Sequence, residues 1–212
     1  RALRVTYAAM SPPLTLLAIA APVIVPIVFG DGWAPSYQVA QVLALAATLT
    51  VAAALDHGLF YGLGQPGRWF WFALVVEAAT ISMTALTAPS GLVAIALGFL
   101  VVATTATVVR WFLVARLLGT SPAVVARPFG FLLVAIIVTG AAGWATLIAS
   151  AQLPSLVRVL FAGMAVLVCH LVVVRVMARD VIDQLARLLR HYNWASRLPF
   201  RVTQNRGPDE ES

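Results

Sequence analysis

The sequence predicts an all-α integral membrane protein, a bundle of six transmembrane helices followed by an amphipathic helix at the membrane interface. Of its 212 residues, 61% are hydrophobic and 10% are charged, and the mean hydropathy is +0.94. A soluble domain of this size cannot bury that much apolar surface, whereas a bundle embedded in a bilayer has no need to. Six apolar segments are each long enough to cross a hydrocarbon core of about 30 Å at 1.5 Å per residue.

The apolar segments are separated by short loops, none of which could fold into a catalytic domain. The chain has no Gly-rich phosphate loop, no H-E-x-x-H, no G-x-S-x-G and a single cysteine, Cys169. We therefore expect no enzymatic activity and no metal or cofactor. The predicted transmembrane helices cover residues 7–29, 38–62, 69–87, 91–113, 128–150 and 155–178.

The first two predicted helices are joined by a tight hairpin. The first helix is expected to end at Phe29, because Gly30 can adopt the left-handed conformation that closes a helix. The loop over 31–35 is rich in turn-forming residues. Within it, Trp33 places an amphipathic ring where such rings prefer to lie, at the membrane–water boundary. The second apolar helix starts at about Tyr37.

Four prolines lie within the first helix, and each removes a backbone donor and tends to kink the helix. Bent and broken helices recur in transporters, where irregular backbone lines a cavity. The other interpretation is that membrane helices simply tolerate proline more readily than soluble ones do. The four positions are Pro12, Pro13, Pro22 and Pro26.

Ionisable side chains occur inside the second and third helices at Asp56, His57 and Glu77. Such groups are costly at membrane depth and usually face a partner or a water-filled path. Because histidine and a desolvated carboxylate can exchange protons near neutral pH, these three are candidates for a proton or cation relay. The alternative is structural: Asp56 pairs with Arg68 or His57 near the interface, and Glu77 is hydrogen-bonded inside the bundle.

The fourth helix contains Arg110, for which two roles are open. Its long side chain can extend to the membrane boundary, or it can grip a phosphate group. The third helix opens with Arg68 followed by aromatic residues 69–72, an arrangement typical of the interfacial belt.

Two sets of small residues indicate close helix packing. Gly58 and Gly62 are four residues apart in the second helix, and the fifth helix contains Gly-Ala-Ala-Gly over 140–143. Small residues at this spacing let helix backbones approach closely. We expect both patches to lie against a neighbouring helix.

The arginines predict the orientation of the chain. The formal net charge is +6, but the basic residues are scattered between apolar segments, which argues against nucleic-acid binding. By the positive-inside rule, both termini lie on the cytoplasmic side of the inner (cytoplasmic) membrane and the first hairpin faces outward. On the cytoplasmic side we place Arg1, Arg4, Arg68, Arg116, Arg127 and the arginines from Arg175 onward, which leaves only Arg158 on the other.

The C-terminal part is predicted to leave the bilayer. Residues 179–192 have an apolar and a basic face, as expected of an amphipathic helix on the inner leaflet, attracted by anionic membrane lipid. Residues 193–212 form a polar tail that we expect to be disordered. The chain begins with Arg rather than Met, so we expect a fragment or processed piece of a longer protein.

The run PVIVPIVFGDGWAP over residues 22–35 resembles a hairpin of the polysaccharide flippases, which belong to the multidrug/oligosaccharidyl-lipid/polysaccharide exporter superfamily. The turn GQPGR over residues 64–68 resembles one that the same proteins carry. The resemblance covers roughly residues 1–178 and the second half of those transporters. Residues that match the hairpin are Pro22, Phe29, Gly30 and Trp33, and the resemblance implies a structural role for them.

The resemblance implies a membrane flippase that moves polyprenyl-linked oligosaccharide units to the outer leaflet for polysaccharide biosynthesis. Its partners would be a polyprenyl-diphosphate-linked glycan, and either a missing N-terminal helical bundle or glycan assembly proteins. Two alternatives stay open: a drug/cation antiporter of the same superfamily, and a membrane scaffold of a glycan assembly complex that transports nothing.

Overall fold

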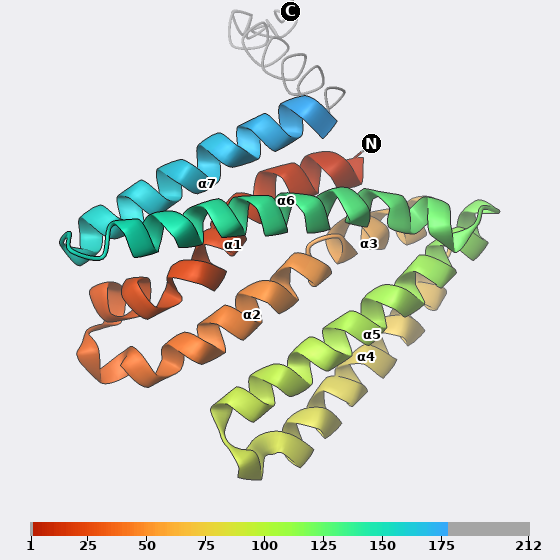
Figure 1. Cartoon of the computed structure of the whole chain (residues 1–212). Coiled ribbons are helices and arrows are strands. Elements are labelled where there is room, and N and C mark those ends of the chain that lie inside the picture. Colours follow the sequence, from red (N-terminus) through yellow and green to blue (C-terminus); the bar gives the residue numbers. More distant parts are fainter. Residues whose placement is uncertain (1, 178–212) are drawn as a thin grey trace, which may run out of the picture.

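The computed structural model describes residues 2–177, and this part is a bundle of helices (Figure 1). The expected amphipathic helix over 179–192 and the tail over 193–212 lie outside the described residues. Two short 3₁₀ turns, η1 (Asp31–Ser36) and η2 (Ala88–Ser90), connect helices at one end of the bundle. The α-helices are α1 (Ala2–Phe29), α2 (Tyr37–Thr50), α3 (Ala53–Gly62), α4 (Pro66–Thr87), α5 (Leu92–Leu118), α6 (Pro122–Ala149) and α7 (Ser155–Met177).

The helices form six spans that are long and apolar enough to cross a membrane, with α2 and α3 sharing one span. Many large apolar side chains point outward, among them Val75, Ile81 and Ile137, each at least 65% exposed. A surface this apolar is stable in lipid and not in water. The described helices are therefore consistent with a multi-pass membrane protein, and the predicted all-α bundle is confirmed.

Within the bundle, α1 packs against α2, α6 and α7, while α5 packs against α2 and α4. Helix α4 contacts mainly α5, with a smaller contact to α3, and has no buried residue. Figure 1 shows the α4–α5 hairpin diverging from the other helices toward its closed end. One side of this hairpin is therefore uncovered by the rest of the described chain.

Gly143 lies where three helices pack closely together. A Cβ atom added at Gly143 of α6 would lie 2.5 Å from Ile19 of α1 and 2.6 Å from Val166 of α7. The predicted packing role of the small residues over 140–143 is thus confirmed. It is wrong for Gly58 and Gly62, where, apart from the adjoining backbone of α3, no atom of the described residues lies within 4 Å of the added Cβ. Those two glycines lie on an open face of α3.

Several helices extend beyond the predicted spans: α1 begins at Ala2, α4 begins at Pro66 and α5 ends at Leu118. Two further differences concern a break within one helix and an early start of another. The single helix expected over 38–62 is interrupted at Val51 and Ala52, between α2 and α3. Helix α6 begins at Pro122, six residues before the predicted start, and continues through Pro128. Proline is well tolerated at the first position of a helix, where its missing N–H has no partner to lose.

The hairpin between α1 and α2 has the expected form. Helix α1 ends at Phe29, and Gly30 has φ +88° and ψ 167°, a conformation that side chains rarely adopt. The positive φ is as expected, but ψ is extended rather than left-handed helical. Trp33 is 59% exposed, its ring 6.0 Å from that of Phe29. Helix α2 then begins at Tyr37.

The prolines of α1 release backbone carbonyls that neighbouring helices use. Because Pro22 has no N–H, the Ala18 carbonyl four residues earlier loses its helical partner. The Gln41 side-chain amide of α2 donates to that carbonyl at 2.8 Å. Each membrane-embedded carbonyl needs such a partner, since lipid offers none. Gln41 therefore joins α2 to α1 through a hydrogen bond to the carbonyl that Pro22 leaves without a helical partner.

The same arrangement recurs near the start of α1. Pro12 releases the Ala8 carbonyl, which lies 2.8 Å from Nε2 of His170 in α7. Since a carbonyl can only accept, His170 carries its hydrogen on Nε2 and donates it. The two interpretations of the prolines were helix bending and simple tolerance. In the structure, Pro12 and Pro22 each free a carbonyl that a side chain of another helix contacts.

Candidate functional site

A buried ion pair joins α3 to α5. Asp56 lies in the first turn of α3, six residues or roughly 9 Å from its end at Gly62. Arg110 Nε of α5 lies 2.9 Å from Asp56 Oδ2. The two residues are 7% and 3% exposed. The Nε–H is not aligned with an acceptor, so the contact is an attraction between charges rather than a well-formed hydrogen bond.

The ion pair lies beside the interruption between α2 and α3. The Leu49 carbonyl of α2 accepts from Arg110 Nη2 and from the Thr107 hydroxyl, each at 3.2 Å. Side chains that insert into the backbone ladder are an established cause of helix breaks. Arg110 therefore has two contacts, one with a carboxylate and one with the backbone at the break.

No glycine or proline marks this break in the sequence. Instead, the Thr48 and Thr50 hydroxyls donate to the carbonyls of Leu45 and Ala47, at 2.6 and 3.2 Å. Bonding of this kind weakens and bends a helix. The two threonines were a signal that sequence reasoning missed, although threonine alone is a weak predictor of a break.

A stripe of polar side chains on α1 extends away from the ion pair. Tyr7, Ser11 and Thr15 are spaced by four residues, so they lie on one face of α1; we call them the polar stripe. All three are at most 3% exposed. Tyr7 interacts electrostatically with both Asp56 and Arg110 and packs against residues of the α2–α3 break and of α6.

The polar stripe is incompletely hydrogen-bonded. Within residues 2–177, the hydroxyls of Ser11 and Thr15 have no hydrogen-bond partner, and neither has Nδ1 of His170. A buried polar atom without a partner costs roughly 1–3 kcal/mol in proteins. Such groups are uncommon in native interiors, which makes this face of α1 an unusual part of the bundle.

The structure brings Asp56 and Arg110 together but separates His57 and Glu77 from them. The His57 ring is exposed and lies 4.4 Å from the Tyr61 ring and 5.6 Å from the Trp69 ring, in a contact between α3 and α4. Glu77 is exposed on α4. A relay through Asp56, His57 and Glu77 is therefore not assembled within the described bundle.

Three structural expectations need correction. Asp56 pairs with Arg110 rather than with Arg68 or His57, and Arg110 points into the bundle instead of extending to its boundary. Glu77 is not enclosed by other described helices. Partner choice depends on how each helix is rotated about its axis, which side-chain spacing along one helix does not reveal.

The remaining predicted residues lie at the far end of the bundle. Pro22, Phe29, Gly30 and Trp33 belong to the hairpin between α1 and α2, and none contacts the ion pair. Among the described residues, no group of three or more His, Cys, Asp or Glu side chains is arranged to hold a metal ion. The site is thus an ion pair, a broken helix and an adjoining polar stripe.

Fold and site together define a helical protein suited to a membrane, with paired charges in its interior. Comparison with known proteins adds nothing to this description: no family model, no curated protein and no solved structure matches the chain.

Proposed function

We propose that this chain is part of a membrane transporter in which the Asp56–Arg110 pair couples an ion or proton to helix movement. The observation that carries the proposal is a buried ion pair placed at a helix break. Ionisable residues inside membrane segments are expensive and usually mark transport paths. Broken helices in membranes likewise occur where they line cavities or bind ions.

The pair offers a simple way of coupling. Protonation of Asp56, or a cation bound to it, would remove the attraction that holds Arg110. Arg110 would then be free to leave the Leu49 carbonyl, which it contacts at 3.2 Å. Because α2 and α3 meet near that carbonyl, the break could then bend. The partnerless hydroxyls of the polar stripe could gain hydrogen bonds in a second arrangement.

The proposed cargo is a polyprenyl-diphosphate-linked oligosaccharide, moved to the outer leaflet for polysaccharide biosynthesis. Its support is the resemblance of residues 22–35 and 64–68 to the flippases of that class. Such cargo needs no covalent chemistry, because a polar path for the sugar suffices while the lipid tail stays in the bilayer.

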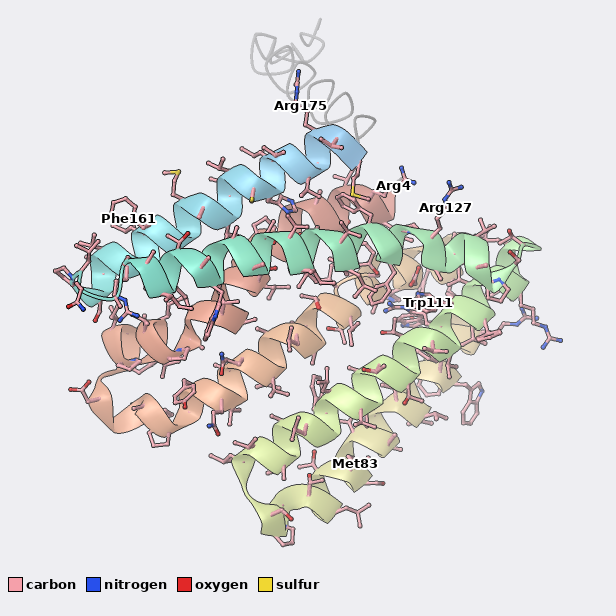
Figure 2. The ribbon with its side chains drawn as sticks, viewed as in Figure 1. Arg4, Met83, Trp111, Arg127, Phe161 and Arg175 are labelled. Atoms are coloured by element: carbon pink, nitrogen blue, oxygen red, sulfur yellow. The ribbon has the colours of Figure 1, made fainter. Side chains whose placement is uncertain are left out.

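The proposed orientation places a basic rim toward the cytoplasm, with both termini there. We define the basic rim as Arg4, Arg68, Arg116, Arg127 and Arg175. Figure 2 shows Arg4, Arg127 and Arg175 at one end of the bundle, and the excess of arginine on this side supports the assignment. Labelling of cysteines introduced at Gly119 and Ser90 tests it: a membrane-impermeant thiol reagent outside the cell should reach only the second.

The test of function compares charge-neutral variants of the protein in its native membrane. Asp56→Asn, and the double variant Asp56→Asn with Arg110→Gln, should lower delivery of lipid-linked sugar to the outer leaflet at least tenfold. Delivery is measured by access of a glycosidase added outside. Asp31→Asn is the matched control, since Asp31 is an exposed carboxylate in η1, and it should leave delivery unchanged.

The comparison is made at equal amounts of folded protein in the membrane. Unchanged delivery by the double variant would overturn the coupling role and favour a scaffold for a glycan assembly complex. Export of cationic dyes without delivery of glycan would favour the drug/cation antiporter.

A further inference from the structure

We propose that the groove between α4 and α5 binds an anionic phospholipid of the surrounding bilayer, with its headgroup phosphate on Arg68 and Arg116. This inference does not depend on the transport proposal. It rests on a surface of the α4–α5 hairpin that the ion pair does not use.

The wide end of the groove lies at the basic rim. A cavity of ≈ 550 Å³ is lined there by Arg68 and Arg116, together with Trp71 of α4. Arg68 is the third residue of α4 and Arg116 is close to the end of α5. Since the two helices form a hairpin closed at η2, their arginines share one end. Among the described residues, the lining of this cavity contains no carboxylate, so its charge comes from the two arginines.

Neither Arg68 nor Arg116 has a hydrogen-bond or ion-pair partner within residues 2–177. No hydrogen bond or ion pair of the described chain uses the guanidinium of Arg68 or Arg116, whereas Arg110 on the same helix is paired with Asp56. Arginine binds phosphate oxygens through several donors at once. Two free guanidinium groups at the edge of a membrane span are therefore suited to one phosphate headgroup.

The narrow part of the groove is apolar and is continuous with the wide end. A cavity of ≈ 220 Å³ shares Phe72 and Val75 with the wide end and extends along α4 to Met83. From Phe72 to Met83 is eleven residues, or roughly 16 Å of helix, which is close to half of a hydrocarbon core of about 30 Å. The labelled Met83 marks the far part of the hairpin in Figure 2. The groove thus has the length of one leaflet.

The position of Glu77 is compatible with an anionic occupant. At 100° per residue, Glu77 lies nearly half a turn from Val75 and Ala79, and it is not among the residues that line the groove. Its carboxylate therefore faces away from the groove and does not repel the headgroup. A phospholipid would place its phosphate on the arginines of the wide end and an acyl chain along the apolar narrow part. Free phosphate would leave the narrow part empty, and a soluble protein would not reach a groove inside the bilayer.

The experiment measures lipid retained by the purified, delipidated protein, using native mass spectrometry with phosphatidylglycerol or phosphatidylcholine added. We expect phosphatidylglycerol to be retained in preference. Arg68→Gln and Arg116→Gln should each weaken its binding roughly fivefold, and the double variant about thirtyfold. Arg127→Gln is the matched control, because Arg127 is an exposed arginine of the same rim that does not line the groove.

A second variant tests the apolar part. Ala79→Phe should obstruct the groove and weaken binding of phosphatidylglycerol with long chains, while its helical circular dichroism stays unchanged. Binding of a short-chain phosphatidylglycerol should be little affected.

Four results would overturn the proposal. Equal losses of phosphatidylglycerol binding in Arg68→Gln, Arg116→Gln and Arg127→Gln would indicate general attraction to the basic rim. Full competition by inorganic phosphate would indicate a site for phosphate alone. Displacement of phosphatidylglycerol by polyprenyl diphosphate would assign the groove to cargo. A dimer mass that appears as lipid is lost would assign it to a second copy of the chain.

Discussion

Replacing Arg110 by Gln is expected to lower the free energy of unfolding by about 3–5 kcal/mol, the cost of removing one partner of a buried ion pair. The variant leaves the Asp56 carboxylate 7% exposed and without its cation. It also removes the guanidinium that donates to the Leu49 carbonyl. Unfolding with SDS in mixed micelles, followed by circular dichroism, gives the difference directly.

The double variant Asp56→Asn with Arg110→Gln separates charge from packing. It leaves no charge unpaired, so its loss of stability should be smaller than the sum of the two single losses. Arg127→Gln is the control, and a change at that exposed arginine should stay within about 0.5 kcal/mol. If Arg110→Gln were no more damaging than Arg127→Gln, the buried pair would not hold α3 against α5.

Gly143→Ala is expected to destabilise the bundle by about 1–3 kcal/mol, as overpacking of a filled interior does. The added Cβ would meet Val166 at 2.6 Å and Ile19 at 2.5 Å. The end of Ile19 can move aside, but Val166 is β-branched and rotates less readily. Helix α7 must therefore shift away from α6. The same unfolding titration measures the loss.

Gly58→Ala is the matched control for this prediction. At Gly58 the added Cβ meets no atom of another described segment within 4 Å, and alanine favours a helix by up to about 1 kcal/mol over glycine. This variant should be neutral or slightly more stable. Equal losses at Gly58 and Gly143 would show that the effect does not come from contact with α1 and α7.

Hydropathy along the chain was enough to predict the all-α bundle and its six apolar spans. Those properties depend on local composition, because any helix that crosses lipid must be long and apolar. The end of α1 at Phe29 could also be predicted, since Gly30 permits a backbone conformation that other residues avoid. The break at Val51 and Ala52 was not predicted, because threonine alone is a weak signal and the other contacts at the break come from side chains of α5.

Only part of the candidate site could be predicted from the sequence: its charged residues, but not which of them pair. The sequence singled out Asp56 and Arg110 as unusual for apolar helices, but it also singled out His57 and Glu77 and did not pair Asp56 with Arg110. Which of them meet depends on how each helix is rotated about its axis, and that rotation is set by packing between distant segments. The role of proline in α1 was hidden for the same reason, since Gln41 and His170 reach the freed carbonyls from other helices.

The amino-acid sequence by itself determined that this chain folds into apolar helices, where the hairpin turns, and that few charges lie inside. Each of these follows from residues that are neighbours in the chain. Only the tertiary structure decided that Arg110 neutralises Asp56, that Gly143 and not Gly58 is a packing site, and that Arg68 and Arg116 share one groove. Those pairings join segments distant in sequence, and helix packing alone brings them within reach.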